Sequence, residues 1–187
     1  FVAYRERMKA FDGIGSVSVF KNVGAEAGAS LPHLHSQILA TPFVPEALQV
    51  ELDRAAGLTL FQTMIDESER LVYRDDAFAV ICPYASRFAH EMWLIPLAEQ
   101  SQYESISDTD CLALAAVLKR VLISLDRALD APAYNWLLHS APQPTPGFRW
   151  HLEILPRTAR PAGFEWATGV FINTTTPEAA TARLRDT

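Results

Sequence analysis

The pattern of apolar and polar positions along the chain predicts a mixture of amphipathic helices and short strands. Apolar residues recur every three or four positions in segments typical of helices, which we expect at 1–11, through the forties and fifties after Pro45, onward to about Glu69, at 107–129 and from Pro177. Alternating or short apolar runs predict strands at 17–20, 33–40, 78–82, 91–96, 134–139 and 148–156. The chain is therefore expected to form an α+β protein.

The segment 107–129 has the clearest helical pattern. Ser107 precedes it, and Asp110 follows three positions later, in a spacing that resembles a capping box. One apolar stripe runs along the predicted helix and consists of Leu114, Leu118, Val121, Leu122, Leu125 and Leu129. We expect this stripe to pack against the core of the protein.

Two segments of the chain resemble each other around a histidine. Residues 33–39 and 149–155 align without a gap and share the central histidine, an Ile-Leu ending and a following proline. This self-similarity predicts two copies of one unit, with boundaries at 1–54 and 55–187 and an incomplete first copy. Because the chain begins with Phe1 inside a helical pattern, we expect the native protein to begin upstream.

The first of these segments carries polar residues that alternate along a predicted strand. Side chains two positions apart share a face of a strand, so His33, His35 and Gln37 should line one surface. Leu34 and Ile38 should point to a core on the other face. The preceding segment 22–30 is rich in small residues, whose backbone amides can approach a ligand closely.

A histidine beside neutral hydrogen-bond donors is suited to nucleotidyl transfer. A neutral imidazole is a good nucleophile toward phosphorus when one ring nitrogen is held by an acceptor and the other is free. A His-x-His pair on a strand also occurs in metal sites and on ordinary surfaces. The residues alone leave these three alternatives open, and the flanking Asn22, Gly28, Ser30 and Gln37 favour the nucleophile.

Composition and charge exclude several classes of protein. Of the 187 residues, 49% are hydrophobic and 20% are charged, which is typical of globular proteins, and the net charge of −6 argues against a nucleic-acid surface. The two cysteines, Cys82 and Cys111, form no CxxC pair, which fits a reducing compartment such as the cytoplasm. No apolar run approaches the roughly 20 residues of a membrane span.

Four segments together resemble a known family. They are residues 20–37, 134–142, 150–157 and 162–165, so the resemblance extends over nearly the whole chain. These segments are similar to galactose-1-phosphate uridylyltransferases and to related ADP-sugar phosphorylases, which belong to the histidine-triad superfamily. The resemblance implies a histidine-triad (HIT-like) fold, with helices packed on an antiparallel sheet, in tandem copies of which the first is truncated here.

The resemblance also implies roles for individual residues. His35 matches the nucleophile that carries the nucleotide, and Gln37 matches a glutamine that binds the transferred phosphoryl group and favours transfer over hydrolysis. The implied reaction is ping-pong transfer from a nucleotide-sugar to a sugar phosphate or phosphate. Residues expected to bind substrate are Asn22, Gly28, Ser30, Ser36, Phe164 and Glu165.

Two metal sites are implied, and both depart from the family pattern. His33 matches a zinc ligand whose partners, a CxxC pair and a histidine, would lie upstream. Glu51, His139 and His151 match three ligands of a second site for zinc or iron, but Glu153 replaces its last histidine. The alternative is a hydrogen-bonded polar cluster in which Arg149 pairs with Glu153.

We therefore expect a nucleotidyltransferase acting on a nucleotide-sugar and a sugar phosphate, with UDP-hexose favoured over an ADP-sugar. One alternative is a histidine-triad hydrolase of nucleotide conjugates, and another is a protein that binds nucleotide-sugars without catalysis. We expect zinc, or iron at the second site, as cofactor. The resemblance further implies a homodimer, and we expect neither nucleic-acid nor membrane partners.

Overall fold

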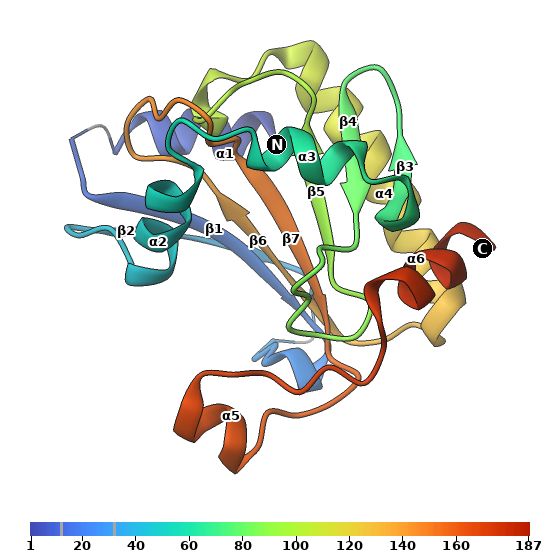
Figure 1. Cartoon of the computed structure of the whole chain (residues 1–187). Helices are drawn as coiled ribbons and strands as arrows, with labels where there is room; N and C mark the ends of the chain where they lie inside the picture. Colours follow the sequence, from blue (N-terminus) through green and yellow to red (C-terminus); the bar gives the residue numbers. More distant parts are fainter. Residues whose placement is uncertain (12, 32) are drawn as a thin grey trace.

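The computed structural model describes residues 1–11, 13–31 and 33–187. It forms three layers, in which one twisted sheet lies between two groups of helices (Figure 1). The strands are β1 (Ser16–Val23), β2 (Ser36–Thr41), β3 (Leu71–Arg74), β4 (Phe78–Ile81), β5 (Met92–Pro96), β6 (Tyr134–His139) and β7 (His151–Pro156). The helices are α1 (Val2–Lys9), α2 (Glu46–Ala55), α3 (Leu60–Asp66), α4 (Asp108–Leu129), α5 (Gly163–Thr168) and α6 (Pro177–Arg185), with short 3-10 turns η1 (Ala25–Ala27), η2 (Ser68–Arg70) and η3 (Tyr103–Ser105). None of the described helices is long and apolar enough to cross a bilayer.

All seven strands form one antiparallel sheet in the order β2-β1-β6-β7-β5-β4-β3. The α+β fold with an antiparallel sheet is confirmed, although the sequence missed the short strand β3. Both hairpins, β1–β2 and β6–β7, lie side by side in the sheet because β1 pairs with β6. The hairpin β1–β2 is therefore part of the same sheet as the other strands.

The register relates the two hairpins by a local two-fold pseudo-symmetry. Phe20 lies opposite Gln37 in the first hairpin, and Leu137 lies opposite Glu153 in the second. Phe20 and Leu137 also face each other across β1 and β6, as a two-fold axis between them requires. This register agrees with the alignment of residues 33–39 on 149–155, while the boundary between 54 and 55 stays a prediction.

Two apolar clusters cover the two faces of the sheet. One lies under α4, α6 and α1 and includes Leu114, Leu125, Trp136 and Leu152. The other lies under α2 and α3 and includes residues such as Phe61. Side chains alternate between the clusters along β4 and β5, because successive strand residues point to opposite faces. Both cysteines are free and buried.

Some local expectations were right and others need correction. Ser107 caps α4 by accepting a 3.0 Å hydrogen bond from the Asp110 backbone, as its spacing predicted. The strand predicted from His33 begins only at Ser36, so His33 and His35 precede β2. Leu34 is exposed rather than in the core, because the sheet does not extend to its position. The helix expected at 1–11 is shorter, because α1 ends at Lys9.

Candidate functional site

Four titratable residues meet on the sheet face that α2 covers. Glu51 comes from α2, His139 ends β6, and His151 and Glu153 lie on β7. One ligand atom from each residue lies within 4.8 Å of the others. The β6–β7 register places His139 opposite His151, and α2 brings Glu51 to them from a distant part of the sequence. The structure thus assembles the three predicted ligands together with Glu153.

A hydrogen bond joins the helix to the sheet in this cluster. His139 Nδ1 and Glu51 Oε2 are 2.8 Å apart. Burial opposes the charge on His139, but this bond and the nearby Glu153 and Glu51 carboxylates raise the pKa of His139 above its ordinary value. Burial raises the pKa of Glu51, yet the bond to His139 lowers it on balance. Glu51 is therefore favoured in its ionised form, and it accepts a hydrogen bond from His139 Nδ1–H.

Arg87 neutralises the buried carboxylates behind the cluster. Its guanidinium lies 2.5 Å from Glu153 and 3.2 Å from Glu91, and both carboxylates are only 1% exposed. Burial disfavours the charge of Arg87, but the two carboxylates hold its pKa above the ordinary range. An acidic residue in a strand predicted to be buried, Glu153, was the signal that a cation must lie nearby.

The expected pairing of Arg149 with Glu153 is wrong. Arg149 instead donates to the carbonyl oxygens of Pro96 and Leu97 and to Gln62. Arg149 precedes β7 and lies four residues before Glu153, about 13 Å along an extended chain, so its side chain bonds to other groups. Glu153 therefore pairs with Arg87, whereas Arg149 bonds to backbone carbonyls and Gln62.

The cluster also contains atoms with no hydrogen-bond partner that could bind a divalent cation as ligands. His151 Nδ1 contacts the Arg149 carbonyl at 3.0 Å, which assigns the ring proton to Nδ1 and leaves Nε2 with a lone pair. Within the described residues, His151 Nε2 and Glu153 Oε1 are buried without a hydrogen-bond partner. Burial is the main cause that lowers the pKa of His151, and the neighbouring His139 lowers it further. The ring is therefore neutral, as metal ligation requires.

His35 has the same ring orientation as His151, in a more open setting. Its Nδ1 lies 3.1 Å from the carbonyl of His33, two residues earlier, as His151 does with Arg149. The half-buried His35 ring is 5.5 Å from the exposed His33 ring. This contact directs the Nε2 of His35 away from the backbone, and the side chain of Gln37 is exposed nearby on β2.

The loop before His35 is anchored to β6. Gly24 has φ +84° and packs so closely that an added Cβ would lie 2.8 Å from Ala133. Gly28 also has a left-handed conformation, with φ +78°, at the end of η1. Asn135 Nδ2 donates to Asn22 Oδ1 at 2.7 Å and to the Ala27 carbonyl at 2.8 Å. The sequence assigned no role to Asn135, which holds the predicted Asn22 in place.

Ser30 and Ser36 are placed differently by this segment. Ser30 is exposed at the end of the loop. The hydroxyl of Ser36 accepts a 2.7 Å hydrogen bond from Tyr4 of α1, on the face opposite Gln37. Because β2 is extended, adjacent residues point to opposite faces, so the structure turns Ser36 away from the Gln37 surface.

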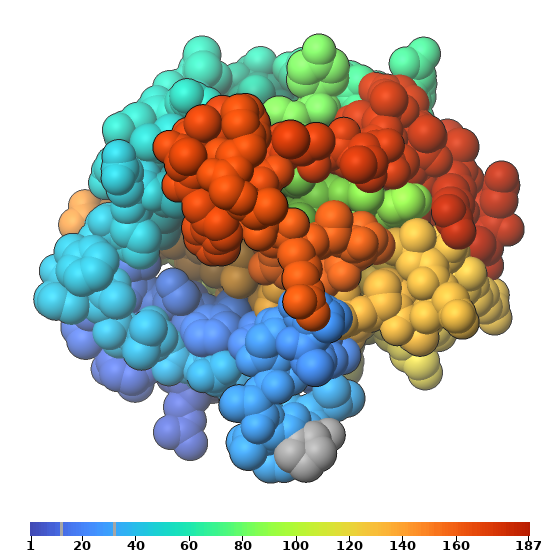
Figure 2. All heavy atoms as spheres, turned by 90° about the horizontal axis from the view of Figure 1, so that it is seen from below, coloured from blue at the N-terminus to red at the C-terminus, as the bar shows by residue number. Residues whose placement is uncertain are grey.

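An arm, residues 160–173, projects below the sheet with α5 at its tip (Figure 1). Arg160 pairs with Glu26 of η1 at 2.6 Å, and Figure 2 shows orange residues of the arm meeting blue residues of the first hairpin beside a hollow. Phe164 is half exposed on α5. The Glu165 carboxylate accepts a 2.8 Å bond from the Ala162 backbone, and such bonds lower its pKa.

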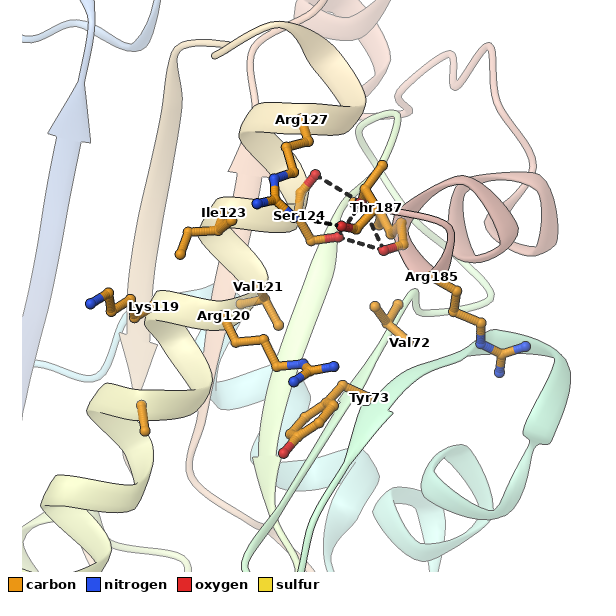
Figure 3. Close-up of a pocket in the computed structure, with 12 residues that line it drawn as sticks. Val72, Tyr73, Lys119, Arg120, Val121, Ile123, Ser124, Arg127, Arg185 and Thr187 are labelled. Carbon is orange, nitrogen blue, oxygen red and sulfur yellow. Dashed lines mark hydrogen bonds between the residues drawn. The ribbon is translucent and has the colours of Figure 1, made fainter.

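A separate basic depression lies between α4, β3 and α6 (Figure 3). Its lining includes Lys119, Arg120, Arg127 and Arg185. Figure 3 shows Lys119 and Arg185 pointing away from each other, while Arg120 lies over the ring of Tyr73 at 4.6 Å. The cations of this depression do not converge on one point.

Comparisons with known proteins agree with this geometry. The model of the family described as "Domain of unknown function (DUF4921)" matches residues 4–187. ADP-glucose phosphorylase of Arabidopsis thaliana is 31% identical over 99% of this chain and 56% of its own length. Galactose-1-phosphate uridylyltransferase of Thermotoga maritima is 30% identical over 94% of this chain and 61% of its own length. The chain thus spans less than two thirds of these relatives.

Solved structures give the same result. The crystal structure of an ADP-glucose phosphorylase from Arabidopsis thaliana with bound ADP-glucose has a TM-score of 0.90 and 29% identity, covering the whole chain and 65% of that protein. A HIT-like protein of Bartonella henselae has a TM-score of 0.52 at 14% identity, which shows the fold alone. The resemblance and the HIT-like fold predicted from the sequence are confirmed.

The Arg87 interaction should be essential for stability. Arg87→Met leaves the Glu153 and Glu91 carboxylates buried without a cation, and we expect a loss of about 3 kcal/mol in unfolding free energy, measured by urea denaturation. This value lies at the low end for buried pairs because Arg87 is itself 37% exposed.

Arg160→Met is the matched control, because its pair with Glu26 is exposed to solvent and should contribute little to stability. Adding Glu153→Gln to Arg87→Met should restore part of the stability, since one unpaired charge is removed. Equal stability of the Arg87 and Arg160 variants would contradict the role assigned to Arg87.

Proposed function

Because this chain belongs to the DUF4921 family and is homologous to galactose-1-phosphate uridylyltransferases, we propose that it transfers a nucleoside monophosphate from a nucleotide-sugar to a sugar phosphate or phosphate through His35. The single observation that carries the proposal is the contact between His35 Nδ1 and the His33 carbonyl. That contact leaves Nε2 free to attack, on a half-buried ring beside an open loop of small residues.

The transfer requires one bond to form at phosphorus as another breaks. The Nε2 lone pair of His35 attacks the α-phosphorus of the nucleotide-sugar, and the sugar phosphate leaves with the electrons of the broken P–O bond. The His33 carbonyl stabilises the resulting imidazolium by accepting from Nδ1–H. A second sugar phosphate, or phosphate, then attacks the same phosphorus and releases His35.

Residues around His35 would position the phosphate and the sugar. Gln37 offers an amide donor for a phosphoryl oxygen, and the small residues of the Gly24–Gly28 turn would let a ligand approach the backbone closely. Asn22 would contact the substrate in the same region, and the hydrogen bond from Asn135 holds its side chain in place. Ser30, on the loop, and Phe164, on the arm, would complete the substrate site, whereas Ser36 and Glu165 would act by holding β2 and α5 in place.

The identity of the nucleotide has two candidates. The sequence favoured UDP-hexose, and the Thermotoga maritima relative carries the uridylyltransferase name. The Arabidopsis thaliana relative with bound ADP-glucose supports an ADP-sugar phosphorylase as the second candidate. In that case, phosphate rather than a sugar phosphate would accept the nucleotide.

Mass spectrometry of the intact protein tests the proposal. After incubation with UDP-glucose or ADP-glucose, we expect a mass increase of one uridylyl or adenylyl group in the wild type and none in His35→Ala. The group that is added identifies the nucleotide.

His90→Asn serves as control, because His90 is buried away from this loop with φ +63°, a conformation that asparagine tolerates. Rapid sugar-nucleotide cleavage by water without an adduct would instead support the hydrolase, and binding with no adduct or turnover would support the non-catalytic alternative. Either outcome contradicts transfer through His35.

We further propose that Glu51, His139, His151 and Glu153 bind one zinc or iron ion. Such an ion would fix α2 to β6 and β7 as a structural crosslink, with the histidines neutral. Two carboxylates make the donor set harder than one with three histidines, which widens the choice of metal. The other metal site, predicted at His33, would need a CxxC pair that this sequence does not contain.

Elemental analysis tests the metal proposal. We expect about one zinc or iron per chain in the purified protein, a loss of most of it in His139→Ala, and retention in His90→Asn. Full metal content in His139→Ala, or none in the wild type after incubation with each metal, would exclude this site.

The exposure of the arm supports the homodimer that the family resemblance implies. Four large apolar side chains are more than half exposed along it: Phe164, Trp166, Val170 and Ile172. Large apolar side chains exposed close together in the sequence are common at interfaces. We propose that a second copy of the chain covers the arm.

Light scattering with size-exclusion chromatography measures the oligomer. The wild type should be a dimer, and Trp166→Ser should shift it toward the monomer, while Leu112→Ser on the outer face of α4 should not. A monomeric wild type at high concentration would rule out this interface.

A further inference from the structure

A cavity with a volume of about 600 Å³ lies beside His151, between α2, α3, β4, β5 and the loop 83–85. This volume is in the range of small-molecule sites. Its walls are largely apolar and include Phe61, Met64 and Trp93, and the exposed Leu60 and Tyr84 stand at its opening. Glu51 and His151 form its inner end, so the cavity borders the titratable cluster.

The walls of the cavity are suited to a flat ring. Trp93 stacks on His151 at 4.6 Å with 19° between the ring planes. A hydrogen bond of 2.9 Å from Trp93 Nε1 to Glu91 fixes the indole in this orientation. Phe61 closes the same region, 5.4 Å from His151. Fixed aromatic surfaces of this kind favour planar ligands, which stack at little conformational cost.

The opening of the cavity carries cations that differ in their pairing. Arg70 lies over the Tyr84 ring at 5.2 Å and pairs with Glu67 and Glu178, so its charge is already balanced. Arg54 is exposed and forms no ion pair with any described residue. A ligand with its ring inside can therefore place one anionic group at Arg54.

The internal repeat indicates which planar anion fits. His151 occupies in the second hairpin the position of His35 in the first, with the same Nδ1 contact to the carbonyl two residues earlier. The cavity therefore lies beside His151, and His151 is the repeat equivalent of His35, the residue that we propose accepts a nucleotide. Phe61 and Trp93 cover the His151 ring, which is fully buried, so a ligand here is bound without being transferred.

We propose that this cavity is a second ligand site that binds a nucleoside monophosphate, with the base against Trp93 and the phosphate at Arg54. The choice of a nucleotide rests on the function proposed for His35, whereas the expectation of a planar ring with one anionic group follows from the cavity itself. His151 Nε2 is not needed for this recognition, because the metal cluster uses that atom.

NMR of the indole N–H groups tests the proposal. Each of the four tryptophans gives one signal, and Trp93→Phe identifies that of Trp93. Adding AMP or UMP should shift the Trp93 signal with at least one of the two nucleotides, in the wild type and equally in His35→Ala. Leu60→Glu, which places a carboxylate at the opening, should weaken this binding at least about tenfold. Leu58→Glu is the matched control, since Leu58 is also exposed but is not among the residues that line the cavity.

Comparison with nucleosides tests the anionic end. The wild type should bind the monophosphate about tenfold more tightly than the nucleoside, because the phosphate gains a charge-assisted hydrogen bond. Arg54→Ala should remove this preference, and Arg120→Ala, in the basic depression of Figure 3, should leave it unchanged.

Several results overturn the proposal. They are a Trp93 signal that neither nucleotide moves, equal effects of Leu60→Glu and Leu58→Glu, or a phosphate preference that depends on Arg120 instead of Arg54. A shift that disappears in His35→Ala assigns the binding to the first site and also overturns it. A shift of the Trp93 signal in a wild type that forms no adduct with either nucleotide-sugar supports the second site while contradicting the function proposed for His35.

Discussion

The antiparallel pairing of β1 with β6 is the constraint on which the candidate site depends. It joins the hairpin that carries His35 to the hairpin that carries His151, with Phe20 opposite Leu137 at the local axis. The same junction lets Asn135 of β6 hold Asn22 of β1 and the Ala27 carbonyl. The shape of the loop before His35 therefore depends on a strand more than a hundred residues later.

The two hairpins present equivalent histidines in different surroundings. Each imidazole is oriented by the carbonyl two residues before it, a contact set by the local extended backbone. His35 is half-buried beside an open loop, whereas His151 is covered by Phe61 and Trp93 and bordered by Glu51 and Glu153. One ring geometry can thus support a nucleophile where the site is open and a metal ligand where it is closed.

Charge balance explains why the second histidine can be surrounded by acids. Glu91 and Glu153 are both buried, and isolated carboxylates there would lower stability. Arg87, in the loop before β5, forms ion pairs with both carboxylates, and His139 donates a hydrogen bond to Glu51. These contacts keep the cluster compact while the lone pairs of His151 Nε2 and Glu153 Oε1 stay available. The cluster differs in this way from a simple packed core.

The family resemblance implied the meeting of Glu51 with His139 and His151. The sequence by itself determined the α+β class, the long capped helix α4 and the repeated histidine motif. These features depend on local periodicity, capping and motif residues, which the order of amino acids encodes directly. Only the tertiary structure decided that β2 begins after His35, that Ser36 bonds to Tyr4, and that Arg87 rather than Arg149 pairs with Glu153. Strand ends and the partners of buried charges depend on which distant segments the sheet brings together, and no local pattern specifies them.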